Sequence, residues 1–193
     1  GNTSKGEKWN FKVTPKDGTD SGSLVEAANV TIGNSASTVT IHAFNNTNPM
    51  ADDDVGLNAT YFDADGDNAE IIFRWFVNNV YVFNDTLLRG PQAPDTLNAT
   101  VISNLSGTNY SKGDKVNVSV TANDGTVDSE TVLSSVLVIE NTAPAVTEPE
   151  FNITSPNQFQ DISVSSNYSD FDGDSGTVTL VWFINNSNVF NET

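Results

Sequence analysis

Apolar and polar residues alternate with a period of two along the middle of the chain. The alternation runs through residues 55–61, 71–77 and 116–122. This period predicts β-strands that bury one face against a core. No stretch combines helical apolar spacing with capping residues, so the pattern predicts an all-β protein.

Turn-forming motifs separate the predicted strands. They are D-A-D-G-D from Asp63, N-N at Asn78, R-G-P-Q-A-P from Arg89 and N-D-G from Asn123. About seven strands with turns between them, in roughly 107 residues, are typical of a two-sheet antiparallel β-sandwich of the immunoglobulin type. Trp75 stands in mid-strand, where such a sandwich has its core tryptophan.

The sequence repeats itself without a gap after 107 residues, which is the separation of Tyr61 from Tyr168. We call this separation the repeat offset. Residues 1–86 and 108–193 share 35 identities in 86 pairs. The recurring motifs are Y-x-D-x-D-G-D from Tyr61 and Tyr168, W-F-x-N-N from Trp75 and Trp182, and F-N-x-T from Phe83 and Phe190. A fixed period of this kind, here 107 residues, predicts tandem copies of one folding unit.

The linkers I-G-N-S-A-S-T, from Ile32, and I-E-N-T-A-P-A, from Ile139, are the best candidate boundaries. They predict the C-terminal part of one repeat in residues 1–35, a complete repeat in 36–142 and the N-terminal part of the next repeat in 143–193. On this division both ends fall inside domains, and the chain is expected to be a segment of something longer.

The order of these motifs, with K-G-D-K from Lys112 and N-T-A-P from Asn141, resembles a known family. It is similar to the tandem immunoglobulin-like, PKD-like and cadherin-like repeats of large archaeal and bacterial cell-surface proteins. The resemblance covers nearly the whole chain. It implies a spacer, adhesive or filament-forming role rather than catalysis, and it is an analogy at the level of the fold.

Composition excludes several classes of function. The formal charge is −17, and no Lys or Arg follows Lys115, so binding to nucleic acid or to anionic lipid is not expected. The chain has no Cys and a single His, His42, which leaves thiol chemistry, disulfides and His-based sites without residues. We expect no enzyme activity, and with no run of 18 apolar residues we expect no membrane insertion within this segment.

Asparagines in N-x-S/T sequons are the clearest candidate modification sites. Of 25 Asn, 13 stand in sequons, whereas the Ser and Thr content alone would give about five. The sites are Asn2, Asn29, Asn45, Asn58, Asn84, Asn98, Asn104, Asn109, Asn117, Asn152, Asn167, Asn185 and Asn191. Any single site can arise by chance in a β-protein rich in Asn and Thr. As a set, they predict N-linked glycans and therefore an extracellular or cell-surface location.

Two acidic loops are candidate calcium sites. Their carboxylates belong to Asp63, Asp65 and Asp67, and to Asp170, Asp172 and Asp174. Alternating Asp residues on a tight loop supply the oxygen ligands that Ca²⁺ needs, although the spacing departs from the EF-hand. The alternative is a D-G hairpin turn decorated with acids. Asp54 and Asp161 are further possible ligands, and the N-D-G motif at Asp124 and the related D-G at Asp17 are interpreted as turns only.

These features favour a structural repeat unit of an extracellular, glycosylated filament, stalk or surface-layer protein. The expected partner is the protein itself, end to end, either as a covalent tandem array or by strand exchange between subunits, in which residues 143–193 and 1–35 complete one domain. The alternative function is an adhesin that recognises carbohydrate or a protein partner, for which Tyr81 and Tyr110 are candidate contacts. An accessory domain of a secreted enzyme is a third interpretation.

Overall fold

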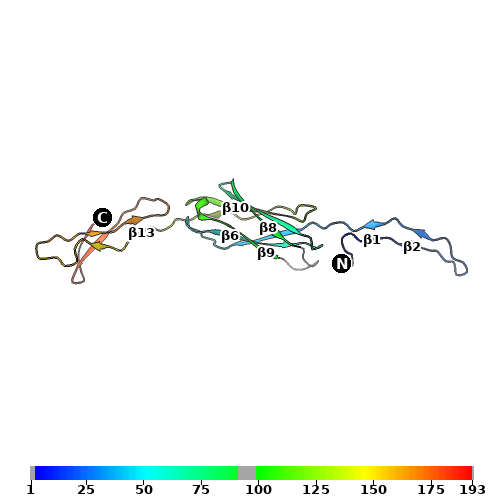
Figure 1. The fold of residues 1–193 in the computed structure, drawn as a ribbon, viewed down its shortest axis with the longest axis horizontal. Helices are drawn as coiled ribbons and strands as arrows, with labels where there is room; N and C mark the ends of the chain where they lie inside the picture. Colours follow the sequence, from blue (N-terminus) through cyan, green and yellow to red (C-terminus); the bar gives the residue numbers. More distant parts are fainter. Residues whose placement is uncertain (1–2, 91–98, 193) are drawn as a thin grey trace.

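The computed structural model describes residues 3–90 and 99–192, and it consists of antiparallel strands joined by turns (Figure 1). One short 3₁₀ helix, η1 (Gly107–Asn109), is the single helical element of these residues. The all-β prediction is therefore confirmed. No helix within the described ranges has the length and apolar character required to cross a membrane.

The central part of the molecule is a sandwich of two sheets. The first sheet has three strands in the order β5-β6-β9, and the second has β11-β10-β7-β8, with β12 also paired to β10. The strands are β5 (Thr38–Phe44), β6 (Val55–Phe62), β7 (Ala69–Val77), β8 (Val80–Arg89), β9 (Ala99–Leu105), β10 (Lys115–Asn123), β11 (Val132–Leu133) and β12 (Leu137–Val138). Because β11 and β12 both pair with β10, they act as one interrupted strand.

The core lies between these two sheets. The inward residues of β6, β7 and β10 are buried, as the period of two predicts. Trp75 is fully buried, its ring lies 6.4 Å from that of Phe44, and its Nε1 donates a hydrogen bond of 2.9 Å to Ser103 Oγ on β9. The two sheets are thus joined by apolar burial and by one buried polar contact.

The turn between β7 and β8 follows from its sequence. Asn78 and Asn79 adopt φ of 50° and 64°, and two left-handed residues form the type I′ turn that suits a two-residue hairpin. Asn tolerates this conformation better than most residues. One repeat offset further along the chain, Asn185 and Asn186 adopt φ of 49° and 64° in the corresponding turn.

Residues 3–35 form a long hairpin held by two short ladders. β1 (Lys8–Trp9) pairs with β4 (Val30–Thr31), and β2 (Lys12–Val13) pairs with β3 (Val25–Glu26). When the repeat offset is added to the residue numbers, the β1–β4 register becomes that of β10 with β12. The β2–β3 register becomes that of β10 with β11. Large apolar side chains of this hairpin remain exposed to solvent.

Residues 143–192 contain three two-stranded ladders. They pair β13 (Ala145–Val146) with β16 (Tyr168–Ser169), β14 (Glu150–Phe151) with β15 (Val164–Ser165), and β17 (Leu180–Ile184) with β18 (Ser187–Glu192). Shifted back by the repeat offset, the first two ladders match the β5–β6 register. The third matches β7–β8, including its register shift after the tryptophan.

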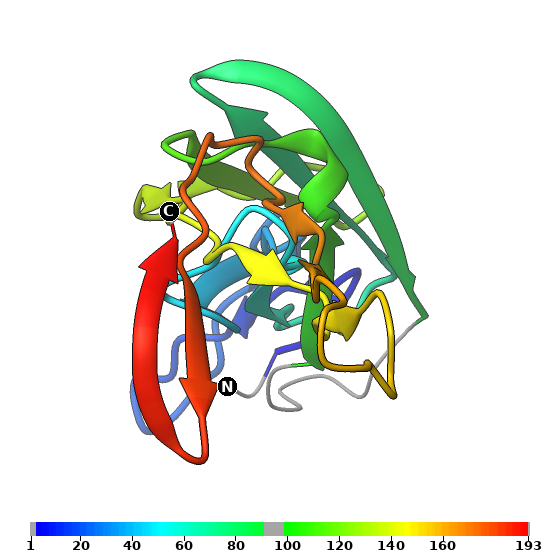
Figure 2. The same cartoon turned by 90° about the vertical axis from the view of Figure 1, so that its left-hand side faces the viewer.

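The three parts follow one another along the long axis of the molecule (Figure 1). The N-terminal hairpin lies at one end, the sandwich in the middle and the C-terminal ladders at the other end. Figure 2 shows the end-on view, in which the red β17–β18 hairpin faces the viewer.

Candidate metal centre and glycan sites

The loop between β6 and β7 is folded around the side chain of Asp63. Its Oδ1 accepts hydrogen bonds from the backbone N–H of Asp65, at 2.9 Å, and of Asp67, at 3.1 Å. Gly66 adopts φ of 74° in this loop, a conformation that glycine adopts at no steric cost. The sequence D-A-D-G-D therefore forms a compact turn that places two carboxylates side by side.

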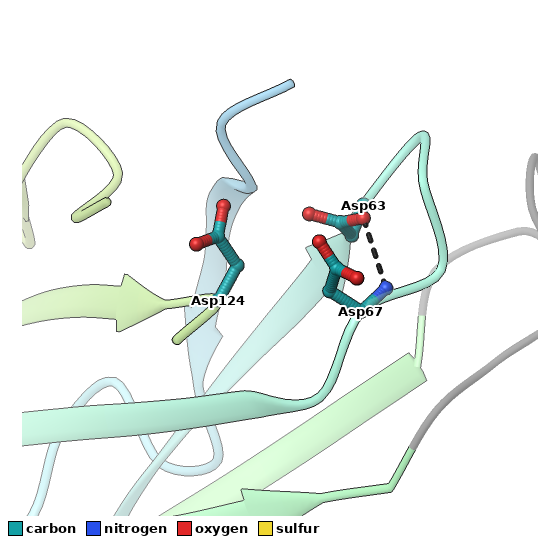
Figure 3. A group of neighbouring side chains, drawn as sticks. All are labelled: Asp63, Asp67 and Asp124. Atoms are coloured by element: carbon teal, nitrogen blue, oxygen red, sulfur yellow. Dashed lines mark hydrogen bonds between the residues drawn. The ribbon is translucent and has the colours of Figure 1, made fainter. Parts of the chain in front are cut away.

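A third carboxylate comes from the distant turn after β10. Oxygens of Asp63, Asp67 and Asp124 all lie within 4.8 Å of one another, and Figure 3 shows Asp124 across from the other two. We call these three residues the acidic cluster. Asp63 and Asp124 are each only 5% exposed. Two acids that are nearly fully buried, beside a third, require a compensating positive charge or proton.

One oxygen of the cluster lacks a hydrogen bond. Asp63 Oδ2 is shielded from solvent and has no partner within residues 3–90 and 99–192. The turn itself explains only Oδ1, so a D-G turn does not account for the whole carboxylate. A hard cation takes such oxygens at about 2.3–2.6 Å. The residues therefore fit a hard cation such as Ca²⁺, which Asp63, Asp67 and Asp124 would hold.

Asp124 is held by several donors. Its Oδ1 accepts from the N–H of Thr126 and Val127, both at 2.8 Å, and its Oδ2 accepts from Asn34 Nδ2 at 2.9 Å. Burial opposes its ionisation, but these hydrogen bonds and the charge of Lys5 outweigh burial, so the pKa of Asp124 is lowered from its ordinary value. Burial and the negative charges of Asp63, Asp124 and Asp67 raise the pKa of the neighbouring Tyr61 hydroxyl.

The lowered pKa of Asp124 predicts a loss of stability in acid. Its ionised form stabilises the fold above the ordinary carboxyl pKa of about 4, and this contribution is lost as the pH falls through the lower folded pKa. Thermal unfolding between pH 2 and 6 should show a steeper fall of the midpoint for the natural chain than for Asp124→Asn. Parallel curves for the two proteins would contradict this assignment.

The acidic cluster lies where the N-terminal hairpin joins the sandwich. Lys5 Nζ forms an ion pair with Asp67, and Asp65 Oδ2 accepts a hydrogen bond from the Ser35 N–H at 2.5 Å. The hydrogen bond to Asp67 raises the pKa of Lys5, although desolvation opposes it. Asp65, a candidate ligand on the sequence pattern, therefore binds the linker instead.

The second acidic loop repeats these contacts one repeat offset further along the chain. Lys112 Nζ pairs with Asp174, and Asp172 Oδ2 accepts from the Thr142 N–H at 2.6 Å. Carboxylate oxygens of Asp170, Asp172 and Asp174 lie within 4.8 Å of one another, but these residues are half-buried or exposed. This loop brings its three predicted ligands together without a buried acid from another turn.

The two further acids lie elsewhere. Asp54 Oδ1 accepts from the Gly107 N–H at 3.0 Å, and Asp161 is exposed. Neither belongs to a group of carboxylates that could share an ion among the described residues. Asp124 and Asn34 were not singled out for the site by the sequence pattern. The D-G-T motif around Asp124 indicates only a turn, and nothing in the sequence shows that this turn meets the β6–β7 loop.

Most sequon asparagines are accessible. Asn2 and Asn98 lie outside the described residues. Asn58 and Asn117 are half-buried, and the exposed sites are Asn29, Asn45, Asn84, Asn104, Asn109, Asn152, Asn167, Asn185 and Asn191. Asn84 lies on β8 and Asn104 on β9, which are the last strands in the order of their sheets. Glycans there would cover two edges that otherwise invite pairing with other chains.

The two tyrosines considered as adhesive contacts differ in exposure. Tyr81 is 51% exposed, and its hydroxyl donates to Asn84 Oδ1 at 2.6 Å. Tyr110 is buried, and its hydroxyl donates to the Asp53 backbone oxygen. Burial raises the pKa of Tyr110 to about 12. Tyr110 therefore packs inside the sandwich and is not available to a partner. His42 is exposed beside Thr60 on the first sheet.

Comparison of the chain with models of known protein families and with curated proteins gives no match.

Proposed function

We propose that this protein is a structural unit of an extracellular, N-glycosylated filament, stalk or surface layer, built from tandem immunoglobulin-like β-sandwiches with a period of roughly 107 residues. Residues 36–142 form one complete unit, and the flanking parts belong to its neighbours along the fibre. Positive-φ turns and strand registers that recur at the repeat offset support this division.

The observation that carries the proposal is the repeated junction. Lys5 contacts Asp67 and the Ser35 N–H contacts Asp65 at the first linker. The contacts of Lys112 and Thr142 with the second acidic loop have the same geometry at the next linker. A joint built twice from the same residues sets the same angle between successive units. Repetition of one angle produces a regular rod rather than a flexible string of beads.

Calcium would strengthen this joint. The acidic cluster receives Asp63 and Asp67 from the β6–β7 loop and Asp124 from the turn after β10, and Asn34 of the linker binds Asp124. A divalent cation held by these acids would tie the two loops of the sandwich together at the position where the preceding unit attaches. Because Lys5 is a single positive charge beside three acids, it neutralises the cluster only in part.

Electron microscopy of the native material tests the proposal. At about 3.3 Å per residue, the ten-residue β8 is roughly 33 Å long, so we expect unbranched fibres with an axial period of the order of one sandwich. Globular particles without an axial repeat would overturn the structural role.

Deglycosylation gives a second test. Treatment of native material with an N-glycan-releasing reagent should lower the intact mass by several glycans, and glycopeptides should map to exposed sites such as Asn84 and Asn104. These two sites lie on edge strands, so their Gln variants should aggregate more readily than the Gln variant of half-buried Asn58. An unchanged mass would contradict glycosylation.

A further inference from the structure

Two parts of the chain each present an open sheet edge. β17 pairs with β18 along one edge, and its other edge has no partner within residues 3–90 and 99–192. Residues 8–13 pair along one edge through β1 and β2, and within the same ranges their other edge is also open. Open edges of this kind bind a further strand.

In the central sandwich, the corresponding strands pair with each other. β10 lies antiparallel to β7, with Val118 opposite Trp75. Shifted by the repeat offset, residues 8–13 carry the registers of β10, and β17 carries those of β7. The two parts therefore supply counterparts of β5 to β8 and of β10 to β12, whereas β9 has no counterpart in either.

We infer that residues 8–33 of one copy of this chain pair with β17 of a second copy and add the counterparts of β10, β11 and β12 to the partial sandwich of its residues 145–192. The inference rests on the proposed end-to-end role and specifies how two copies meet. Transferred by the repeat offset, the β10–β7 register places Trp9 opposite Ile184, Phe11 opposite Trp182 and Val13 opposite Leu180.

Apolar exposure on both parts supports this pairing. Trp9 is 49% and Phe11 67% exposed, whereas Val116 and Val118, at the corresponding positions of β10, are fully buried. The joint would cover Trp9 and Phe11, which are larger than the valines and would add apolar volume to the shared interior. Exposed aromatic residues at positions that are core in the same fold indicate a surface that is buried in the assembly.

Residues 145–192, the part that would accept the strand, also leave aromatic side chains exposed that are buried in the central sandwich. Phe151 is 59% exposed, whereas Phe44 at the corresponding position is 9% exposed. Trp182 is half-buried, whereas Trp75 at the corresponding position is fully buried. The rings of Phe151, Trp182 and Phe190 already pack against one another on the side of β17 and β18 that carries Trp182.

Charge favours the same contact. Residues 1–35 contain four Lys and four acidic residues, whereas residues 143–193 contain seven acidic residues and no Lys or Arg. The pairing would bring Lys16 of the donor toward a part of the chain that has only negative charge, whereas Lys12 is paired with Glu26 within its own hairpin. The donor's Asp17 would take the place beside Asp170 and Asp174 that Asp124 has beside Asp63 and Asp67.

The two parts that would pair lie on opposite sides of the central sandwich, so they do not meet within the described structure. The N-terminal hairpin and β17–β18 lie at opposite ends of the molecule, with the central sandwich between them (Figure 1). Each copy would donate at one end and accept at the other. This head-to-tail contact generates an open fibre.

Disulfide trapping of the full chain tests the register. The chain has no Cys, so Asn10→Cys and Phe183→Cys, which the register places opposite each other, can be made in separate proteins and mixed under mild oxidation. We expect covalent dimers at least tenfold above those from Asn10→Cys mixed with Thr179→Cys. Thr179 lies four positions away, beyond disulfide reach. Equal yields from the two mixtures would overturn the register.

Assembly itself gives an independent readout. Phe11→Asp should abolish end-to-end multimers in light scattering, whereas Phe159→Asp should leave them unchanged, because Phe159 is 97% exposed and lies outside the proposed contact. Loss of multimers in both variants, or in neither, would overturn the inference. Fibres that consist of one long polypeptide on a denaturing gel would overturn strand exchange and leave the proposed function intact. Register-specific dimers of the purified chain, together with native material that contains no fibres, would support strand exchange and overturn the proposed function.

Discussion

Replacement of Trp75 by Ala should unfold the central sandwich or lower its thermal midpoint by about 12 °C or more. Removal of a fully buried Trp costs about 3–5 kcal/mol, and each kcal/mol shifts the midpoint of a domain near 100 residues by about 4–8 °C. The variant also leaves Ser103 Oγ without its bond to Trp75. Circular dichroism during heating measures the shift.

Trp182→Ala is the matched control. Trp182 corresponds to Trp75 in sequence but is only half-buried in the single chain, so the same substitution should leave the unfolding of the central sandwich unchanged. In the assembled fibre, by contrast, Trp182→Ala should become destabilising, because the joint would bury this side chain. If Trp75→Ala does not fold, Trp75→Phe gives a milder variant whose midpoint should still fall. Equal effects of the two Ala substitutions in the single chain would contradict the difference in burial.

Calcium should raise the thermal midpoint of the natural chain. A ligand that binds only the folded state stabilises it by about 2.7 kcal/mol at one hundred times its dissociation constant, which corresponds to a shift of roughly 10 °C or more. Extracellular modules bind Ca²⁺ at about 10⁻⁴–10⁻³ M, so a titration to about 10 mM covers the expected range. The measurement compares unfolding in Ca²⁺, in Mg²⁺ and in chelator.

Asp63→Asn and Asp65→Asn separate the acidic cluster from the loop as a whole. Asp63 belongs to the acidic cluster and has an oxygen without a partner among the described residues, whereas Asp65 binds the Ser35 N–H. The calcium response should disappear in Asp63→Asn and persist in Asp65→Asn. Equal midpoints of the natural chain in Ca²⁺ and in chelator would leave Lys5 as the counter-charge of the cluster.

The acidic cluster and the open sheet edges both concern contacts between successive units. At the first junction, the preceding hairpin contributes Lys5 and the linker contributes Asn34 and Ser35. At the far end, Thr142 and Lys112 make the same kind of contacts with the second acidic loop. The stiffness of the proposed rod would therefore depend on calcium and on pH through Asp124, whereas its continuity would depend on strand pairing.

Local periodicity determined the strands of the central sandwich. Alternation in residues 55–61, 71–77 and 116–122 predicted buried positions that the structure confirms, because the side chains of a strand point to opposite faces by covalent geometry alone. The turns at Asn78 and at Asp63 were likewise predictable, since Asn and Asp-Gly sequences favour left-handed backbone.

Only the tertiary structure decided which loops meet. It brought Asp124 to Asp63 across 61 positions of sequence, turned Asp65 toward the linker, and buried Tyr110, which the sequence had offered as a possible adhesive contact. It also left Trp9 and Phe11 in solvent although their strand pattern is that of a core. Sequence spacing fixes the direction of a side chain along its own strand. The neighbour that covers that side chain depends on sheet order and on which chain supplies the facing strand, and neither is encoded in local periodicity.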